Sequence, residues 1–280
     1  MNKSDRNFII AIGAIAVIFI GGYAGLAAYT GFTSPFSVVM SQSMQHDITH
    51  SEIGIIDTGD VVIVKDPSKA EICSYIEGTQ NGYESFGDYG SVIIYNRGNG
   101  QNPVIHRAIL WLEYNTNTDT WSASTLKNYS GEWSVIDPET NTRTNNWSSM
   151  RGVLEFTAIT NSSKNVKIDL DSLQKKSGYL TMGDNPVTNK YFDQSVGIIN
   201  HLISADDIRS VAAMEIPWIG CIKLMIKGSD NLKYVTNSIP SLIMSFVTII
   251  LLVFTFDAVS LYQNQRGIRH KIECAKKYSR

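Results

Sequence analysis

Two long apolar segments bracket this 280-residue chain, and they limit its fold more than any other feature. Residues 8–29 contain no charged side chain, and residues 239–262 contain only Asp257. About 20 consecutive apolar residues in a helix span the hydrocarbon core of a bilayer, which is roughly 30 Å thick. We therefore expect an N-terminal transmembrane anchor within residues 1–30 and a C-terminal transmembrane helix at residues 236–263.

The first apolar segment also has an alternative interpretation as a cleavable secretory signal. Lys3 and Arg6 form a basic start, and small residues surround Ala27. The apolar run exceeds the roughly 7–15 residues typical of such signals, which favours a retained anchor.

Basic residues predict how the two helices are oriented. Lys3 and Arg6 precede the first helix, and a basic tail at residues 264–280 follows the second. Because Lys and Arg are enriched on cytoplasmic flanks, we expect a two-span protein of the cell membrane, with both termini cytoplasmic and residues 31–235 extracytoplasmic. The net charge of −2 gives no electrostatic case for nucleic acid as a partner.

The region between the two helices is expected to be mostly β. Gly and Pro turns separate its short β-prone runs. These runs are residues 37–40, 61–64, 91–95, 104–112, 153–160, 179–182 and 211–226. We interpret residues 31–112 and 178–235 as two parts of one β domain.

Residues 113–177 are interpreted as an insertion into that domain, part loop and part small satellite sheet, because they are rich in Asn, Thr, Ser and Trp. Packing of the insertion is the favoured role of Trp121, Trp133 and Trp147, and a sugar-binding surface is the alternative. Sequons at Asn128, Asn146 and Asn161 fit a surface exposed to glycosylation. The cysteines show no metal-ligand spacing, and a Cys73–Cys221 bridge stays an open alternative.

The serine-rich run Ser41-Gln-Ser-Met44 lies just beyond the first apolar segment and contains a candidate nucleophile. A serine needs a base to take its proton and donors to stabilise an oxyanion. His46 and His50 resemble a metal-binding pair, but no helix and no third ligand type is evident there, so a solvated loop is favoured.

His106 lies in the apolar run 103–110, beside Arg107. Two neighbouring cations in an apolar strand each need a partner, so His106 is either a satisfied core histidine or a general base. Two carboxylates could orient it. Asp184 lies in a Gly-Asp-Asn-Pro turn, and Asp193 is the next acidic residue along the chain.

In their order along the chain, these motifs resemble type I signal peptidases of the archaeal and endoplasmic-reticulum branch, which use a Ser–His pair. The motifs are Ser41-Gln-Ser-Met44, Ile56-Asp-Thr-Gly-Asp-Val-Val-Ile-Val64, Ile105-His-Arg107, Gly183-Asp-Asn185 and, as a closing strand, Ile216-Pro-Trp-Ile-Gly220. The resemblance covers roughly residues 8–107 and 178–220. The chain departs from the family at Gln42, Gln45-His46 and Pro186, where the family commonly has Gly, Glu-Pro and Asn.

The resemblance implies a signal-peptidase-like β fold and a membrane-bound serine endopeptidase that cleaves signal peptides from exported precursors. Ser43 would be the nucleophile and His106 the general base, with Asp184 or Asp193 orienting His106. The Ser43 backbone N–H and the Ser41 hydroxyl would form the oxyanion hole.

The substrate would lie extended beside residues 37–40 and place small residues before the cut. The expected substrate contacts are Val38, Val39, Met40, Gln42 and Met44. The implied partners are signal-peptide-bearing precursors and membrane lipid, with accessory subunits or translocation machinery left open. No metal or other cofactor is expected. The alternatives are a non-catalytic membrane-anchored surface binding module and a precursor-processing peptidase of narrower specificity.

Overall fold

A computed structural model describes residues 3–98, 100–160, 165–228, 233, 235 and 238–278. The helices are α1 (Lys3–Thr30), α2 (Tyr75–Asn81), α3 (Gly220–Lys227) and α4 (Ser238–Tyr278). The strands are β1 (Phe36–Val38), β2 (Val61–Lys65), β3 (Glu84–Ser85), β4 (Asp88–Tyr89), β5 (Val92–Tyr95), β6 (Val104–Asn115), β7 (Thr120–Ser122), β8 (Trp133–Ile136), β9 (Arg143–Thr144), β10 (Val153–Phe156), β11 (Val166–Asp169), β12 (Gly178–Met182) and β13 (Ile208–Ile216).

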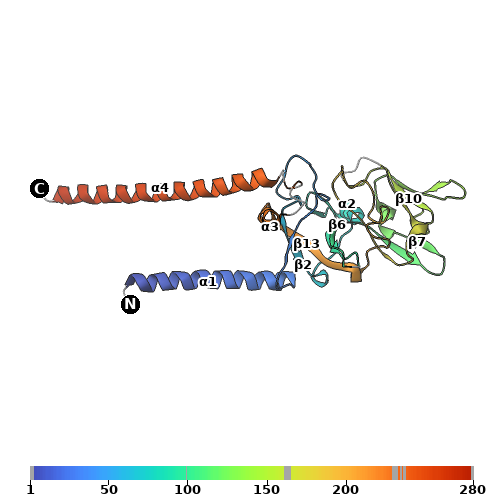
Figure 1. The fold of residues 1–280 in the computed structure, drawn as a ribbon, viewed down its shortest axis with the longest axis horizontal. Helices are drawn as coiled ribbons and strands as arrows, with labels where there is room; N and C mark the ends of the chain where they lie inside the picture. Colours follow the sequence, from blue (N-terminus) through green and yellow to red (C-terminus); the bar gives the residue numbers. More distant parts are fainter. Residues whose placement is uncertain are drawn as a thin grey trace.

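The two terminal helices leave the β-rich domain on the same side (Figure 1). Residues 5–30 and 238–267 are long and apolar enough to cross a membrane, and their most apolar windows are 0% and 6% buried within the protein. A core helix would bury such side chains against the domain, whereas these expose them. The pair therefore fits a two-span membrane protein.

The chain as a whole is 34% helix and 25% strand, so the expected mostly β class describes only the region between the terminal helices. The difference comes from α1 and α4, which have 28 and 41 residues. α4 continues as one helix through most of the basic tail that we expected to be a separate segment.

A seven-stranded antiparallel sheet forms the main body of the domain, in the order β1-β2-β13-β5-β6-β12, with β7 paired to the end of β6. Ile93 of β5 lies opposite His106 of β6, and Met182 of β12 lies opposite Arg107. The β6–β12 register shifts between Leu180 and Thr181, just before the turn that follows β12. Such a bulge bends a strand and redirects its next side chains.

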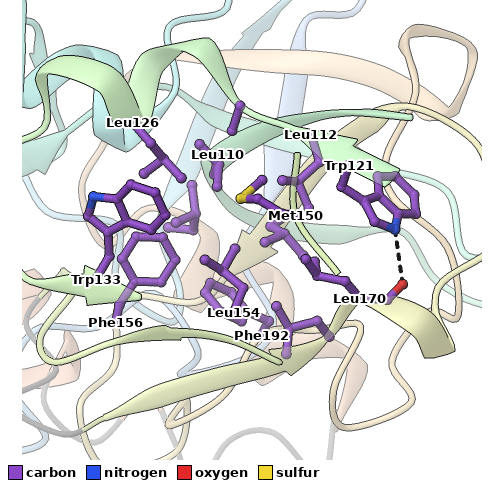
Figure 2. Packing of buried hydrophobic residues seen from close by; sticks show 14 of the residues in the cluster. Leu110, Leu112, Trp121, Leu126, Trp133, Met150, Leu154, Phe156, Leu170 and Phe192 are labelled. Atoms are coloured by element: carbon purple, nitrogen blue, oxygen red, sulfur yellow. Dashed lines mark hydrogen bonds between the residues drawn. The ribbon is translucent and has the colours of Figure 1, made fainter. Parts of the chain in front are cut away.

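A four-stranded sheet, β11-β10-β8-β9, lies in the expected insertion. Its core is continuous with the main sheet, because apolar side chains of β6 pack against those of β8 and β10 (Figure 2). Leu180 and Met182 of β12 belong to the same buried cluster. Trp121 and Trp133 are buried there, and Trp121 Nε1 donates to the Leu170 carbonyl oxygen at 3.1 Å. Packing, rather than sugar binding, is thus the role of these two rings, and Trp147 packs partly buried against the same cluster.

The predicted strand over residues 211–226 is wrong in its second half. β13 ends at Ile216, Trp218 has a φ of 64°, and α3 begins at Gly220. Pro217 and this left-handed residue break the strand, so the motif at residues 216–220 is a strand-to-helix junction. The short helix α2 was also missed, although Ser74 and Glu77 form a capping box at its start.

Two of the three sequon asparagines, Asn128 and Asn146, are exposed, and Asn161 lies outside the described residues. Cys73 and Cys221 are both free, so the bridge left open in the sequence analysis is not formed.

Candidate active site

Ser43 is held in a tight turn directly after β1. Val39 extends the pairing of β1, because its N–H donates to the Asp60 carbonyl oxygen at 2.9 Å. Gln45 N donates to the Gln42 carbonyl oxygen at 3.1 Å, and Met44 is buried in the core beneath. The half-buried Ser43 is thereby presented with its Oγ 3.2 Å from the hydroxyl oxygen of Ser41, which is exposed.

The turn that follows β12 braces the Ser43 segment from the other side. Asn185 N donates to the Ser43 carbonyl oxygen at 3.0 Å, and Asn185 Nδ2 donates to the Gln42 carbonyl oxygen at 2.7 Å. Gly183 lies so close that a side-chain carbon at this position would overlap the Ser43 carbonyl oxygen. Glycine is required here by close backbone approach.

His106 is buried on β6 and hydrogen-bonded to Asp193. Its Nδ1 lies 2.7 Å and 2.8 Å from the two carboxylate oxygens, and the Tyr95 hydroxyl donates to the same carboxylate at 2.7 Å. Asp193 reaches this position because its own N–H donates to the Thr181 carbonyl oxygen at 2.9 Å, which folds the chain back along β12. With Nδ1 committed to a carboxylate, Nε2 is the nitrogen that can exchange a proton with a hydroxyl.

Arg107 points to the opposite face of β6 and pairs with Asp184, as alternation along a strand requires. Its Nε donates to one Asp184 oxygen at 2.9 Å, and its Nη2 contacts the other. Burial alone would raise the pKa of Asp184, but the adjacent guanidinium outweighs burial and leaves that pKa below its ordinary value. The expected pairing of Arg107 with a carboxylate is therefore present.

The guanidinium of Arg107 also closes a neighbouring loop. The two N–H groups of its Nη1 are shared among four backbone carbonyl oxygens at distances of 2.9–3.2 Å. These oxygens belong to Ser85, Asp88, Tyr89 and Gly90. A buried charge with this many partners is fully satisfied and acts as a structural clasp.

These contacts separate the two acids that the sequence left as alternatives. Asp193 contacts His106, whereas Asp184 contacts Arg107 and lies 3.5 Å from His46 Nε2. Asp193 is therefore the carboxylate placed to fix the His106 tautomer, and Asp184 is not.

The pairing of β12 with β6 brings the Ser43 segment and the His106 strand together. Met182, the last residue of β12, lies opposite Arg107, the residue after His106. Gly183, the next residue, lies against the Ser43 carbonyl oxygen. Within the described part of the chain, the Ser43 hydroxyl bonds to Ser41 and makes no direct hydrogen bond to His106. Catalytic hydrogen bonds are often long in unliganded sites and shorten when substrate binds.

The expected substrate contacts divide into two groups. β1 is an edge strand, so a peptide can add to it, and Met40 is exposed beside it, with Val38 and Gln42 half-buried. Val39 and Met44 are buried in the core, so neither is available to a substrate. Their inclusion was wrong, because strand alternation turns Val39 inward and the Ser43 turn does the same for Met44.

The sequence analysis missed two residues that contact the acids of the site, Tyr95 and His46. Tyr95 could have been found from strand pairing, since Ile93 lies opposite His106 and Tyr95 lies two residues along on the same face. His46 was assigned to a solvated loop with His50, yet its imidazole reaches Asp184, whereas His50 is exposed. In the described part of the chain, no group of three or more His, Cys, Asp or Glu side chains could hold a metal ion.

A second group of acids lies beneath the Ser43 segment. Burial raises the pKa of Asp57, and it raises the pKa of Asp60 and of Glu215 to about 7. Asp60 accepts hydrogen bonds from the backbone N–H groups of Asp57 and Trp218. This cluster ties the loop before β2 to the end of β13.

No protein-family model and no curated protein sequence matches this chain. The case for function therefore depends on the chemistry of the site.

Proposed function

We propose that this protein is a membrane-anchored serine endopeptidase of the signal peptidase type, which removes signal peptides from exported precursor proteins. The observation that carries the proposal is the buried His106–Asp193–Tyr95 group. Its histidine lies on β6, and the turn after the neighbouring strand β12 hydrogen-bonds to the Ser43 segment. A histidine, an orienting carboxylate and a presented serine are the parts that acyl transfer needs.

In the proposed reaction, Ser43 Oγ attacks the scissile carbonyl carbon while His106 Nε2 accepts the hydroxyl proton. The tetrahedral oxyanion is stabilised by the Ser43 N–H and the Ser41 hydroxyl. When the peptide bond breaks, His106 returns the proton to the leaving amine. Water then hydrolyses the acyl-enzyme with His106 again as base, and Asp193 stabilises the imidazolium in both halves.

The membrane arrangement supports a membrane-bound substrate. The Ser43 turn lies 13 residues beyond the end of α1, so the nucleophile is tethered near the point where the chain leaves the bilayer. A precursor held by its own apolar segment would present an extended peptide to the edge of β1. We place both termini in the cytoplasm and the domain on the outer side.

The test uses the full-length chain in detergent and a precursor with Ala before the cut. Ser43→Ala should abolish cleavage, and His106→Ala should lower kcat by at least about 10³-fold, because such residues act as a unit. Ser34→Ala, an exposed serine of the same segment, is the matched control and should cleave normally. Undiminished cleavage by Ser43→Ala would eliminate the mechanism, and no cleavage by the unaltered chain of any signal-bearing precursor would favour a binding module.

A further inference from the structure

The short helix α3 has one buried face and one exposed apolar face. Cys221 and Leu224 pack into a small core with Val235 and Leu242. The other face exposes large apolar side chains, with Ile226 81% exposed. The exposed members are Ile219, Ile222, Met225 and Ile226, and Lys223 and Lys227 lie exposed among them. Exposed apolar groups gathered in this way mark a site of contact with a protein, a membrane or a ligand.

An apolar groove of about 470 Å³ runs between this face and the edge of the main sheet. Val38 of β1 and Val61 of β2 form one wall, and Ile219, Ile222 and Ile226 form the other. Lys223 and Lys227 also line it. The groove thus has apolar walls that suit an acyl chain and two cations that suit a phosphate headgroup.

The position of α3 identifies what covers it. α3 lies on the side of the domain from which α1 and α4 extend (Figure 1). Leu224 of α3 packs with Leu242, which belongs to the apolar span of α4. The exposed face is therefore next to the point where the chain enters the bilayer.

We propose that α3 and the groove beside it form a lipid-contact site, which lies in the interface of the membrane that α1 and α4 span. The Ile and Met side chains enter the acyl boundary, and Lys223 and Lys227 bind the phosphates of anionic phospholipids. A stable protein partner would need roughly 800 Å² of matched surface, whereas a bilayer needs none and is already held alongside. This inference does not depend on peptidase activity.

The test measures how deeply α3 lies in full-length protein reconstituted in nanodiscs. Single cysteines carrying an environment-sensitive fluorophore are placed by Ile226→Cys, by Glu139→Cys as a water-exposed control and by Ile250→Cys as a control within the span of α4. Glu139 is exposed in the turn between β8 and β9 of the four-stranded sheet, whose strand β10 lies at the far end of the domain from α1 and α4 (Figure 1). The unaltered chain, labelled in parallel, gives the background from its own cysteines.

With lipids that carry a quencher near the headgroup, the label at position 226 should be quenched several-fold more than the label at 139. In discs containing phosphatidylglycerol, Lys223→Gln with Lys227→Gln should reduce this quenching, and in pure phosphatidylcholine it should not. Equal quenching at 226 and 139 in both lipids would overturn the proposal. Protection of position 226 from both lipid-borne and soluble quenchers would also overturn it, because a protein would then cover α3.

Discussion

His106 and Arg107 are neighbours on β6, yet they meet different acids on opposite faces of the sheet. His106 shares Asp193 with a tyrosine hydroxyl and keeps one ring nitrogen for proton exchange. Arg107 donates its hydrogen bonds to Asp184 and to backbone carbonyl oxygens. The comparison teaches that one strand carries a histidine–carboxylate pair on one face and a fully hydrogen-bonded arginine–carboxylate pair on the other.

The largest predicted effect is on catalysis, and it should be seen only for the acid on the His106 face of β6. Asp193→Asn should lower kcat for precursor cleavage by about 10³–10⁴-fold, because the amide no longer holds the His106 tautomer or stabilises its cation. The measurement is the steady-state rate together with the unfolding midpoint, which should change little. Asp184→Asn is the matched variant on the other face, and its main effect should fall on stability. If both variants lost the same activity at unchanged stability, the division of roles would be wrong.

Removing the Arg107 guanidinium should lower the stability of the fold. Arg107→Met leaves Asp184 buried without its cation, so the free energy of unfolding should fall by about 3–5 kcal/mol. Chemical unfolding in detergent checks this, with the exposed Arg209→Met as control. A loss below 1 kcal/mol would contradict the structural role of the ion pair.

A single methyl group added at Gly183 should disrupt the contact between the turn after β12 and the Ser43 segment. The added Cβ of Gly183→Ala overlaps the Ser43 carbonyl oxygen, so stability should fall by about 1–3 kcal/mol and cleavage should slow. Gly25→Ala is the control, because an added carbon there meets no atom within 4 Å. Equal behaviour of the two variants in rate and unfolding midpoint would argue against the brace.

The smallest effect concerns the acids beneath the site. Glu215 accepts a hydrogen bond from Gly54 N, and its other oxygen is buried without a partner among the described residues. Burial raises its pKa from 4.5 to about 7, so its contribution to stability is present below pH 4.5 and is lost as pH rises through 7.

Glu215→Gln removes this titration. The variant should be more stable than the unaltered chain by about 1–2 kcal/mol at pH 8, and the difference should shrink toward pH 5. Unfolding midpoints at the two pH values measure it. A difference independent of pH would show that Glu215 is not the titrating group.

Much of the fold follows from local pattern. The apolar runs predicted both terminal helices, and short β-prone runs between Gly and Pro turns predicted β2, β5, β6 and β12 within a few residues. The capping box at Ser74 was an unused signal for α2. The error at α3 has a different cause, because a short apolar run suits a strand and a helix equally.

By itself, the sequence determined which segments are apolar enough to leave water and which side chains could do chemistry. It supplied Ser43, His106 and two acids, but not their pairing. Tertiary structure alone assigned Asp193 to His106, residues 87 positions apart, and Asp184 to Arg107. The physical reason is that hydrophobic periodicity is encoded locally, whereas hydrogen-bond partners depend on strand register and on how the chain after β12 folds back. Those long-range contacts form only when the whole sheet is assembled.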